Sequence, residues 1–184
     1  MDSWLLELHS AASALKSLER KGWRLRGVRD PESVADHSLA LAVLSCALAA
    51  ARGLDPGKAA LIAVLHDLPE AFTGDLMPGE KASLGEERLS VIEDTALARI
   101  LDRAPDAVRN LLTEAVSEYR MGVSPEGRLV RDLDKLEMVL QAVEYIDELG
   151  TEGVKEFAES ALKNVKDQEI STLIGDLLRG LRSD

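Results

Sequence analysis

The chain has 184 residues, of which 46% are hydrophobic, and a formal net charge of −11. This length and composition fit a single domain with its own core, which needs no disulfide for stability. The negative charge argues against a partner that is a nucleic acid polymer, since such interfaces neutralise many phosphates with Lys and Arg.

No apolar run approaches the roughly 20 residues that cross a bilayer. The amino terminus, Met1-Asp2-Ser3-Trp4, lacks the basic and then apolar pattern of a targeting segment. We therefore expect a soluble, cytoplasmic protein with no membrane partner. Cys46 is the only cysteine and lies in an apolar stretch, so we expect a small buried side chain rather than a nucleophile.

Apolar residues recur at steps of three and four through most of the chain, which predicts an all-α fold. Ser33 and Asp55 are expected to cap two helices, and Pro56 to begin the second of them. A polar turn is expected after residue 20, and residues 69–85 are expected to form an irregular loop at the mouth of a site. The predicted helices cover about 3–20, 33–52, 56–67, 86–102, 105–120, 127–149, 152–165 and 168–182.

Two of the three histidines lie in apolar segments. His37 shares a helix face with Val34 and Leu41, so its imidazole is expected to point inward. His66-Asp67 closes an apolar run, and burying such a pair is costly unless something satisfies it. A divalent cation does so, although a lone histidine at either position could equally be a satisfied core residue.

A fourth candidate ligand is Asp134, which lies between Leu133 and Leu136 and is expected to face inward, with Asp132 and Glu137 as alternatives. Two imidazoles and two carboxylates without a thiolate suit Mn, Co, Fe, Ni or Zn. Such a set leaves coordination positions on the metal open for water and substrate. The sequence therefore predicts one divalent metal in a catalytic type of site.

These residues and their surroundings resemble the HD-domain metal-dependent phosphohydrolases, and within them the 5′-deoxynucleotidase group. The resemblance covers about residues 20–145, while the helices at about 150–182 carry no motif. It implies that the whole chain, 1–184, is a single HD-domain helical bundle with the metal in its interior. The motifs are Arg20-Lys-Gly-Trp23, Pro31-Glu-Ser-Val-Ala-Asp-His37, His66-Asp-Leu-Pro-Glu70, Gly74-Asp75, Glu118-Tyr119, Leu133-Asp-Lys-Leu-Glu137 and Leu140-Gln-Ala-Val-Glu-Tyr145.

The resemblance further implies that His37, His66, Asp67 and Asp134 hold one divalent metal. Glu70 would then be the acid/base residue, one helical turn beyond Asp67, although it could merely cap a short helix. The implied reaction is hydrolysis of deoxyribonucleoside 5′-monophosphates to deoxynucleoside and phosphate.

For the substrate, the resemblance implies that Arg20 or Lys21 clamps the phosphate, with Arg24 and Arg26 left open as alternatives. Trp23 would pack near the sugar and disfavour a 2′-hydroxyl, with ordinary packing as its alternative. Asp75 would accept a hydrogen bond from the 3′-hydroxyl and take part in the catalytic site, or else cap a helix.

Two other functions are alternatives to this hypothesis, and a third hypothesis concerns the oligomeric state. A pyrophosphohydrolase acting on guanosine alarmone-like nucleotides would need a more basic pocket, and the sequence shows no matching cluster of Lys and Arg beyond residues 20–29. In the second alternative the metal is structural and only holds helices together, and the protein is non-catalytic. A homodimer is expected through apolar residues of the late helices, namely Phe157, Ala161, Leu162, Leu173, Leu177 and Leu178.

Overall fold

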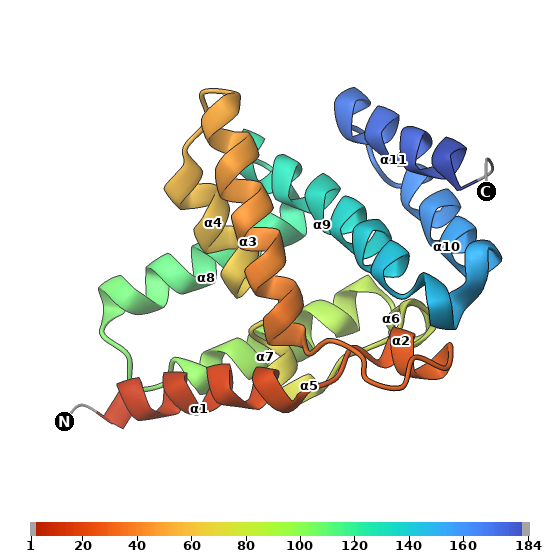
Figure 1. Cartoon of the computed structure of the whole chain (residues 1–184). Coiled ribbons are helices and arrows are strands. Elements are labelled where there is room, and N and C mark those ends of the chain that lie inside the picture. The colour runs from red at the N-terminus through yellow and green to blue at the C-terminus, as the bar shows by residue number, and fades with distance from the viewer. Residues whose placement is uncertain (1–2, 182–184) are drawn as a thin grey trace.

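The computed structural model describes residues 3–181, and every extended regular element within that range is an α-helix. The all-α prediction is therefore confirmed (Figure 1). In chain order the helices are α1 (Ser3–Ser17), α2 (Lys21–Leu25), α3 (Val34–Ala51), α4 (Pro56–Leu65), α5 (Glu70–Thr73), α6 (Pro78–Leu84), α7 (Glu86–Ile100), α8 (Asp106–Met121), α9 (Pro125–Glu144), α10 (Ile146–Leu162) and α11 (Gln168–Gly180).

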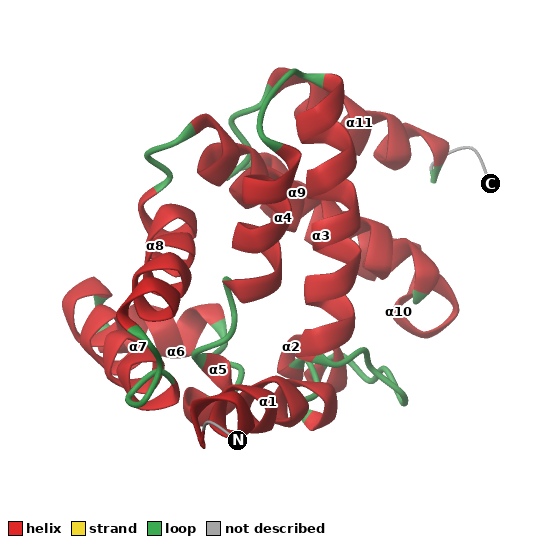
Figure 2. Ribbon diagram, turned by 90° about the vertical axis from the view of Figure 1, so that its left-hand side faces the viewer, coloured by secondary structure: helices red, strands yellow, loops and turns green. Residues whose placement is uncertain are grey.

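Helices α3 and α4 run side by side in the middle of the bundle, and α9 packs against both (Figures 1 and 2). Helices α1, α5 and α7 contact one another below them, while α10 and α11 pack along α9. The main core therefore lies between α3, α4 and α9, where Leu41, Ile62 and Val130 are almost fully buried.

Both predicted caps are confirmed at the start of the central helices. The Ser33 hydroxyl accepts a hydrogen bond from the backbone N–H of Asp36, and the Asp36 carboxylate accepts one from the backbone N–H of Ser33. The Asp55 carboxylate accepts from the backbone N–H groups of Gly57 and Lys58. These bonds satisfy N–H groups that a helix start leaves without partners.

The structure departs from the predicted elements in three places. The turn after residue 20 contains the short helix α2, and the expected loop at 69–85 contains α5 and α6. The last long helices divide at Tyr145, and Gly150, with φ 68°, makes a kink inside α10 instead of ending a helix. Glycine accepts this left-handed conformation without the steric cost of a Cβ.

A short antiparallel bridge fixes the segment before α2 against the start of α3. The backbone N–H of Arg20 donates to Glu32 O at 3.0 Å, and that of Val34 donates to Leu18 O at 2.8 Å. Arg20 therefore lies next to the helix turn that carries His37.

The apolar residues of the late helices mostly pack inward. Phe157 and Ala161 are buried, and Leu162, Leu177 and Leu178 pack against the cores, whereas Leu173 is 46% exposed. Five of the six side chains therefore pack within the chain, which leaves little of this set exposed for self-association. Whether the chain forms a homodimer stays a prediction.

The outer face of α3 is apolar and exposed. Leu39 is 66% exposed and Val43 61%, and Cys46, expected to be buried, is exposed on the same face. Helix α3 is long and apolar enough to cross a membrane by length and composition alone. Its opposite face packs on α4 and α9, as in the core helix of a bundle.

Candidate metal centre

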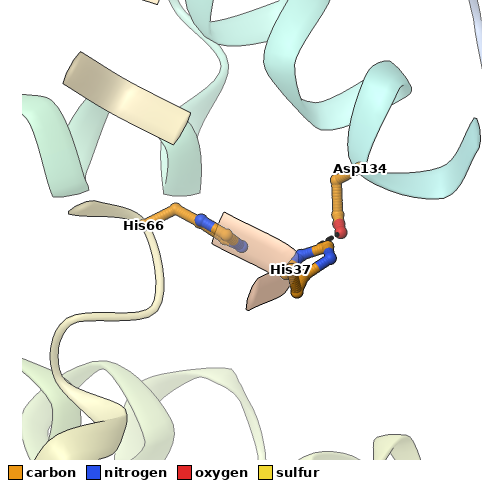
Figure 3. Close-up of side chains that lie close together, drawn as sticks. All are labelled: His37, His66 and Asp134. Atoms are coloured by element: carbon orange, nitrogen blue, oxygen red, sulfur yellow. Dashed lines mark ion pairs between the residues drawn. The ribbon is translucent and has the colours of Figure 1, made fainter. Parts of the chain in front are cut away.

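Three side chains from the three central helices converge in the interior (Figure 3). His37 lies in the first turn of α3, His66 follows the last residue of α4, and Asp134 lies in α9. One donor atom from each lies within 4.8 Å of the others, and all three residues are buried. The fold thus brings together residues that the sequence separates widely.

The orientation of His66 is fixed by the backbone of α4. Its Nδ1 lies 2.7 Å from Ala63 O, and because a carbonyl only accepts, Nδ1 donates this hydrogen bond. With Nδ1 as the donor, Nε2 is the ring nitrogen left to bind a metal, and it lies 3.0 Å from Asp67 Oδ2. This nitrogen is available as a ligand.

His37 is held between two carboxylates. Its Nδ1 lies 2.5 Å from Glu137 Oε2, while its buried Nε2 faces Asp134 Oδ1 at 3.3 Å without forming a hydrogen bond. Burial and Arg20 lower the pKa of His37, but the carboxylates of Asp134 and Glu137 outweigh them and raise it to about 9.

Asp134 is oriented by two further residues. Its Oδ2 accepts hydrogen bonds from the Tyr119 hydroxyl at 2.6 Å and from Lys135 Nζ at 2.7 Å. Burial acts to raise the pKa of Asp134, but Lys135 and the neighbouring histidines hold it well below its ordinary value. The group is therefore a carboxylate, and its Oδ1 is left facing His37.

The two alternatives to Asp134 are engaged elsewhere. Asp132 accepts hydrogen bonds from the backbone N–H groups of Lys166 and Asp167, at 3.2 and 2.9 Å. Glu137 contacts His37 at Nδ1, whereas Asp134 faces Nε2 of the same ring. Among the three acids, Asp134 is the one grouped with both histidines.

Asp67 lies at the edge of this group. Its Oδ2 is 3.0 Å from His66 Nε2 and 3.6 Å from Arg20 Nη1, but Asp67 does not belong to the group of His37, His66 and Asp134. Burial raises the pKa of Asp67, and the stronger effect of His66, Arg20 and His37 lowers it well below its ordinary value.

This arrangement fits a divalent cation. The buried Nε2 of His37 has no hydrogen-bond partner, and the Nε2 of His66 lies beside the Asp67 carboxylate. With Asp134 these groups form a buried nitrogen and oxygen donor set. The partners of His37 and Asp134 also match the second layer of hydrogen bonds that orients ligands in metal sites.

Glu70 lies next to the donor set at the start of α5. The residue is 8% exposed, and its Oε2 has no hydrogen-bond partner. Its Oε1 lies 3.5 Å from Lys81 Nζ. Burial, together with the charge of Asp67, raises the pKa of Glu70 to about 9, and Lys81 opposes this shift.

Of the four basic residues considered for phosphate binding, Arg20 approaches the donor set. Lys21 Nζ pairs with Glu80 at 2.7 Å on the surface, and its backbone N–H donates to the Asp75 carboxylate at 2.5 Å. Arg24 pairs with Glu19, and the Arg26 guanidinium lies over the Phe157 ring.

Trp23 is 2% exposed and belongs to the smaller core cluster, between Tyr145 and Phe157. Its Nε1 donates a 2.9 Å hydrogen bond to Glu32 Oε1. This position favours the packing alternative for Trp23 over contact with a sugar.

Sequence reasoning assigned no role to Tyr119, Lys135 or Lys81, and considered Glu137 only as a direct ligand. A signal existed for Tyr119, because it shares a helix face with the buried Leu112 and Val116. A tyrosine on an inward face needs a partner for its hydroxyl, and Asp134 is that partner.

Comparison with known proteins agrees with this geometry. The profile of the HD domain family matches residues 12–174. The chain is 32% identical to the human protein named 5′-deoxynucleotidase HDDC2, over 94% of this chain and 84% of that one.

Solved structures with a similar fold were also found. A conserved hypothetical protein from Pyrococcus furiosus is 34% identical and superposes with a TM-score of 0.75, covering 97% of this chain and 99% of that one. A protein from Magnetospirillum magnetotacticum MS-1, described as a predicted metal-dependent phosphohydrolase, shares the fold with a TM-score of 0.74 at 17% identity, over 98% and 95% of the two chains.

Proposed function

Because the chain belongs to the HD domain family, we propose that it is a metal-dependent phosphohydrolase that converts deoxyribonucleoside 5′-monophosphates to deoxynucleosides and phosphate. The convergence of His37, His66 and Asp134 in the interior carries this proposal. Its substrate class is supported by similarity to a human protein that bears the name 5′-deoxynucleotidase.

In this proposal the whole chain acts as one domain, and His37, His66, Asp67 and Asp134 hold one divalent ion. The donor set suits Mn, Co, Zn, Fe or Ni. A bound cation supplies Lewis-acid chemistry, because it offsets the negative charge that develops on the phosphoryl oxygens.

Glu70 is proposed to move the proton. Its buried Oε2 has no hydrogen-bond partner. The raised pKa of Glu70 reflects burial and the negative charge of Asp67, and a cation held by Asp67 would offset that charge and favour the ionised carboxylate. The carboxylate would then take a proton from the attacking water and return it to the departing 5′-oxygen. The balanced products are a deoxynucleoside and phosphate.

Arg20 is the proposed phosphate clamp, because its guanidinium faces the donor set while the ammonium of Lys21 is paired with Glu80. Asp75 accepts a hydrogen bond from the backbone of Lys21, which holds its carboxylate beside this segment. We retain Asp75 as the group that accepts a hydrogen bond from the 3′-hydroxyl.

The proposal is tested by measuring phosphate release from a panel of deoxy- and ribonucleoside monophosphates with Mn, Co, Zn and Mg. Glu70→Gln is expected to lower kcat by about 10²- to 10⁴-fold while its metal content stays that of the wild type. Glu87→Gln, on the exposed surface of α7, is the matched control.

A folded, metal-loaded Glu70→Gln variant with undiminished turnover would remove Glu70 from the mechanism. Metal binding without phosphate release from any substrate of the panel would favour the non-catalytic alternative. Release of pyrophosphate from guanosine polyphosphates would favour the pyrophosphohydrolase.

We also propose that the protein is a cytoplasmic homodimer that acts on a small nucleotide and not on a nucleic acid polymer or at a membrane. The exposed apolar face of α3, with Leu39 and Val43, supports a second copy as the occupant. Val43→Glu is expected to give a monomer in light scattering after gel filtration, and Leu173→Glu to leave the dimer intact.

A further inference from the structure

A cleft of about 1060 Å³ begins at the candidate metal centre and continues along α9. His66, Asp67 and Lys81 line one part of it. Residues of α9 line it from Lys135 back to Pro125, which corresponds to about 15 Å of helix. The cleft is therefore much longer than a single phosphoryl group at the metal centre requires.

The charge of this cleft is opposite to that of the chain. Its lining includes eight Lys and Arg residues but five Asp and Glu residues, whereas the chain has 22 and 33. Five of these cations form what we call the cationic arm: Arg128, Arg131, Lys135, Lys163 and Lys166. The sequence shows no matching cluster of Lys and Arg beyond residues 20–29, and folding assembles this cluster from residues of separate helices.

Three members of the cationic arm share one face of α9, since Arg128, Arg131 and Lys135 are spaced by three and four residues. Arg128 Nη1 donates to Gly122 O and Val123 O, and Arg131 Nη1 donates to Arg120 O. These acceptors are backbone carbonyls in and just after the last turn of α8. They orient the two guanidinium groups without neutralising their charge with a carboxylate. Lys135 differs, because its Nζ pairs with the Asp134 carboxylate at 2.7 Å at the end of the row next to the metal centre.

Lys163 and Lys166 come from the connection between α10 and α11, and both are exposed. Neither forms an ion pair with any residue in the described part of the chain. The nearby acids are occupied, because Asp167 pairs with Arg52 and Asp132 accepts the backbone N–H groups of Lys166 and Asp167. Asp132 thereby fixes this connection against α9.

We propose that the cationic arm binds a phosphoryl group in addition to the one at the metal centre. Arg guanidinium groups contact two phosphate oxygens at once, and Lys adds a compact charge. The ligand is a small phosphoanion, either free phosphate or the distal phosphoryl groups of a nucleoside di- or triphosphate. A polymer does not fit, because the charge of the rest of the chain would repel it.

The test is calorimetric titration of the metal-loaded protein with tripolyphosphate and with inorganic phosphate. The double variant Arg131→Gln/Lys163→Gln is expected to bind tripolyphosphate about tenfold more weakly than the wild type. The control Lys16→Gln/Lys155→Gln removes the same charge from exposed or half-exposed positions outside the cleft, and is expected to keep its affinity within about twofold.

Weaker binding of both anions to the cleft variant would identify free phosphate as a ligand of the arm. Weaker binding of tripolyphosphate alone would identify the distal groups of a longer ligand that is anchored at the metal centre. Equal losses in both double variants, or no loss in the cleft variant, would overturn the proposal. Lys166→Gln provides a second, single-charge check.

No turnover is needed in this experiment. Phosphate binding to the arm and hydrolysis of a deoxynucleoside monophosphate are therefore separate results, and either of the two proposals can fail while the other stands.

Discussion

Glu137 touches the candidate metal centre through His37. It is 3% exposed, and its carboxylate lies 2.5 Å from His37 Nδ1, on the side of the ring opposite to Asp134. A carboxylate in this position fixes the ring and makes the other nitrogen a better donor. Glu137 is thus a positioning residue for the proposed metal site.

Glu137→Gln is expected to weaken metal binding by about 10- to 100-fold, because the amide keeps a hydrogen bond but loses the charge. Metal titration followed by elemental analysis measures the change. Glu144→Gln, an exposed position on the same helix, serves as the control. Unchanged affinity in Glu137→Gln would show that the contact has no role in binding the ion.

Trp23 is expected to contribute to the stability of the fold, because its side chain is buried. Replacing it by Phe keeps an aromatic ring beside Phe157 but leaves the half-buried Glu32 without its indole donor. We expect a loss of about 1–3 kcal/mol in the free energy of unfolding and an unchanged ratio of deoxy to ribo substrates. Denaturant unfolding and kcat/KM for paired substrates measure the two effects.

Trp4→Phe is the matched control, since the chain has two tryptophans and Trp4 is half-buried without such a bond. A lower deoxy preference in Trp23→Phe at wild-type stability would return Trp23 to the role of a sugar gate.

At the scale of single residues, His37 and Asp134 could be proposed as ligands because each is a polar side chain on an apolar helix face. His66 and Asp67 could be proposed because they close an apolar run. The residues that contact these ligands could not be predicted from the sequence. Glu137 and Lys135 look like the charged residues of any solvated helix, and only the position of α9 against α3 shows what they touch. Arg20 could not be separated from Lys21 by sequence, because the bridge to Glu32 decides which side chain faces inward.

At the scale of elements, Asp167 joins two ends of the bundle. Its carboxylate caps α11 by accepting from the backbone N–H groups of Glu169 and Ile170, and it pairs with Arg52 at the end of α3. The hydrogen bond from Arg52 is the main cause that lowers the pKa of Asp167 below its ordinary value, against the effect of burial.

Asp167→Asn is expected to lower the melting temperature, because the amide still caps the helix but cannot form the ion pair. Asp167→Ala loses the cap as well, which is expected to lower the free energy of unfolding by about 1 kcal/mol more. Since the pKa is lower in the folded state than in the unfolded state, the carboxylate stabilises the fold above the unfolded value of about 3.9. This contribution is lost as the pH falls below that value.

The difference in melting temperature between wild type and Asp167→Asn should therefore be full at pH 7 and 5 and shrink by pH 3. Glu169→Gln, which removes an exposed partner of Arg52, is expected to change the melting temperature less. A difference that persists undiminished at pH 3 would contradict this origin.

The long helices were predictable because a repeat of three and four residues extends over many turns. The short helices α2, α5 and α6 were not, since each has seven residues or fewer and lies among glycines and prolines. Such helices depend on tertiary contacts and not on their own propensity. Glu70 of α5 and Lys81 of α6 lie 3.5 Å apart, and this contact could not be read from the sequence of the segment.

At the scale of the whole molecule, the donor set joins α3, α4 and α9, the three helices that enclose the main core. An ion that binds the folded state and not the unfolded chain stabilises the whole domain by mass action. The same core buries many apolar side chains without the ion, so the protein is expected to stay folded after chelation.

Removing the metal with a chelator and restoring Mn, Co or Zn at about 100 times the dissociation constant should raise the melting temperature by about 5–10 °C, from a gain of about 2.7 kcal/mol. His66→Ala is expected to abolish this shift because it removes one donor of the set. His9→Ala removes a histidine on the exposed surface of α1 and should keep the shift. If both variants respond to metal like the wild type, the ion binds elsewhere, and the three central helices hold one another by packing alone.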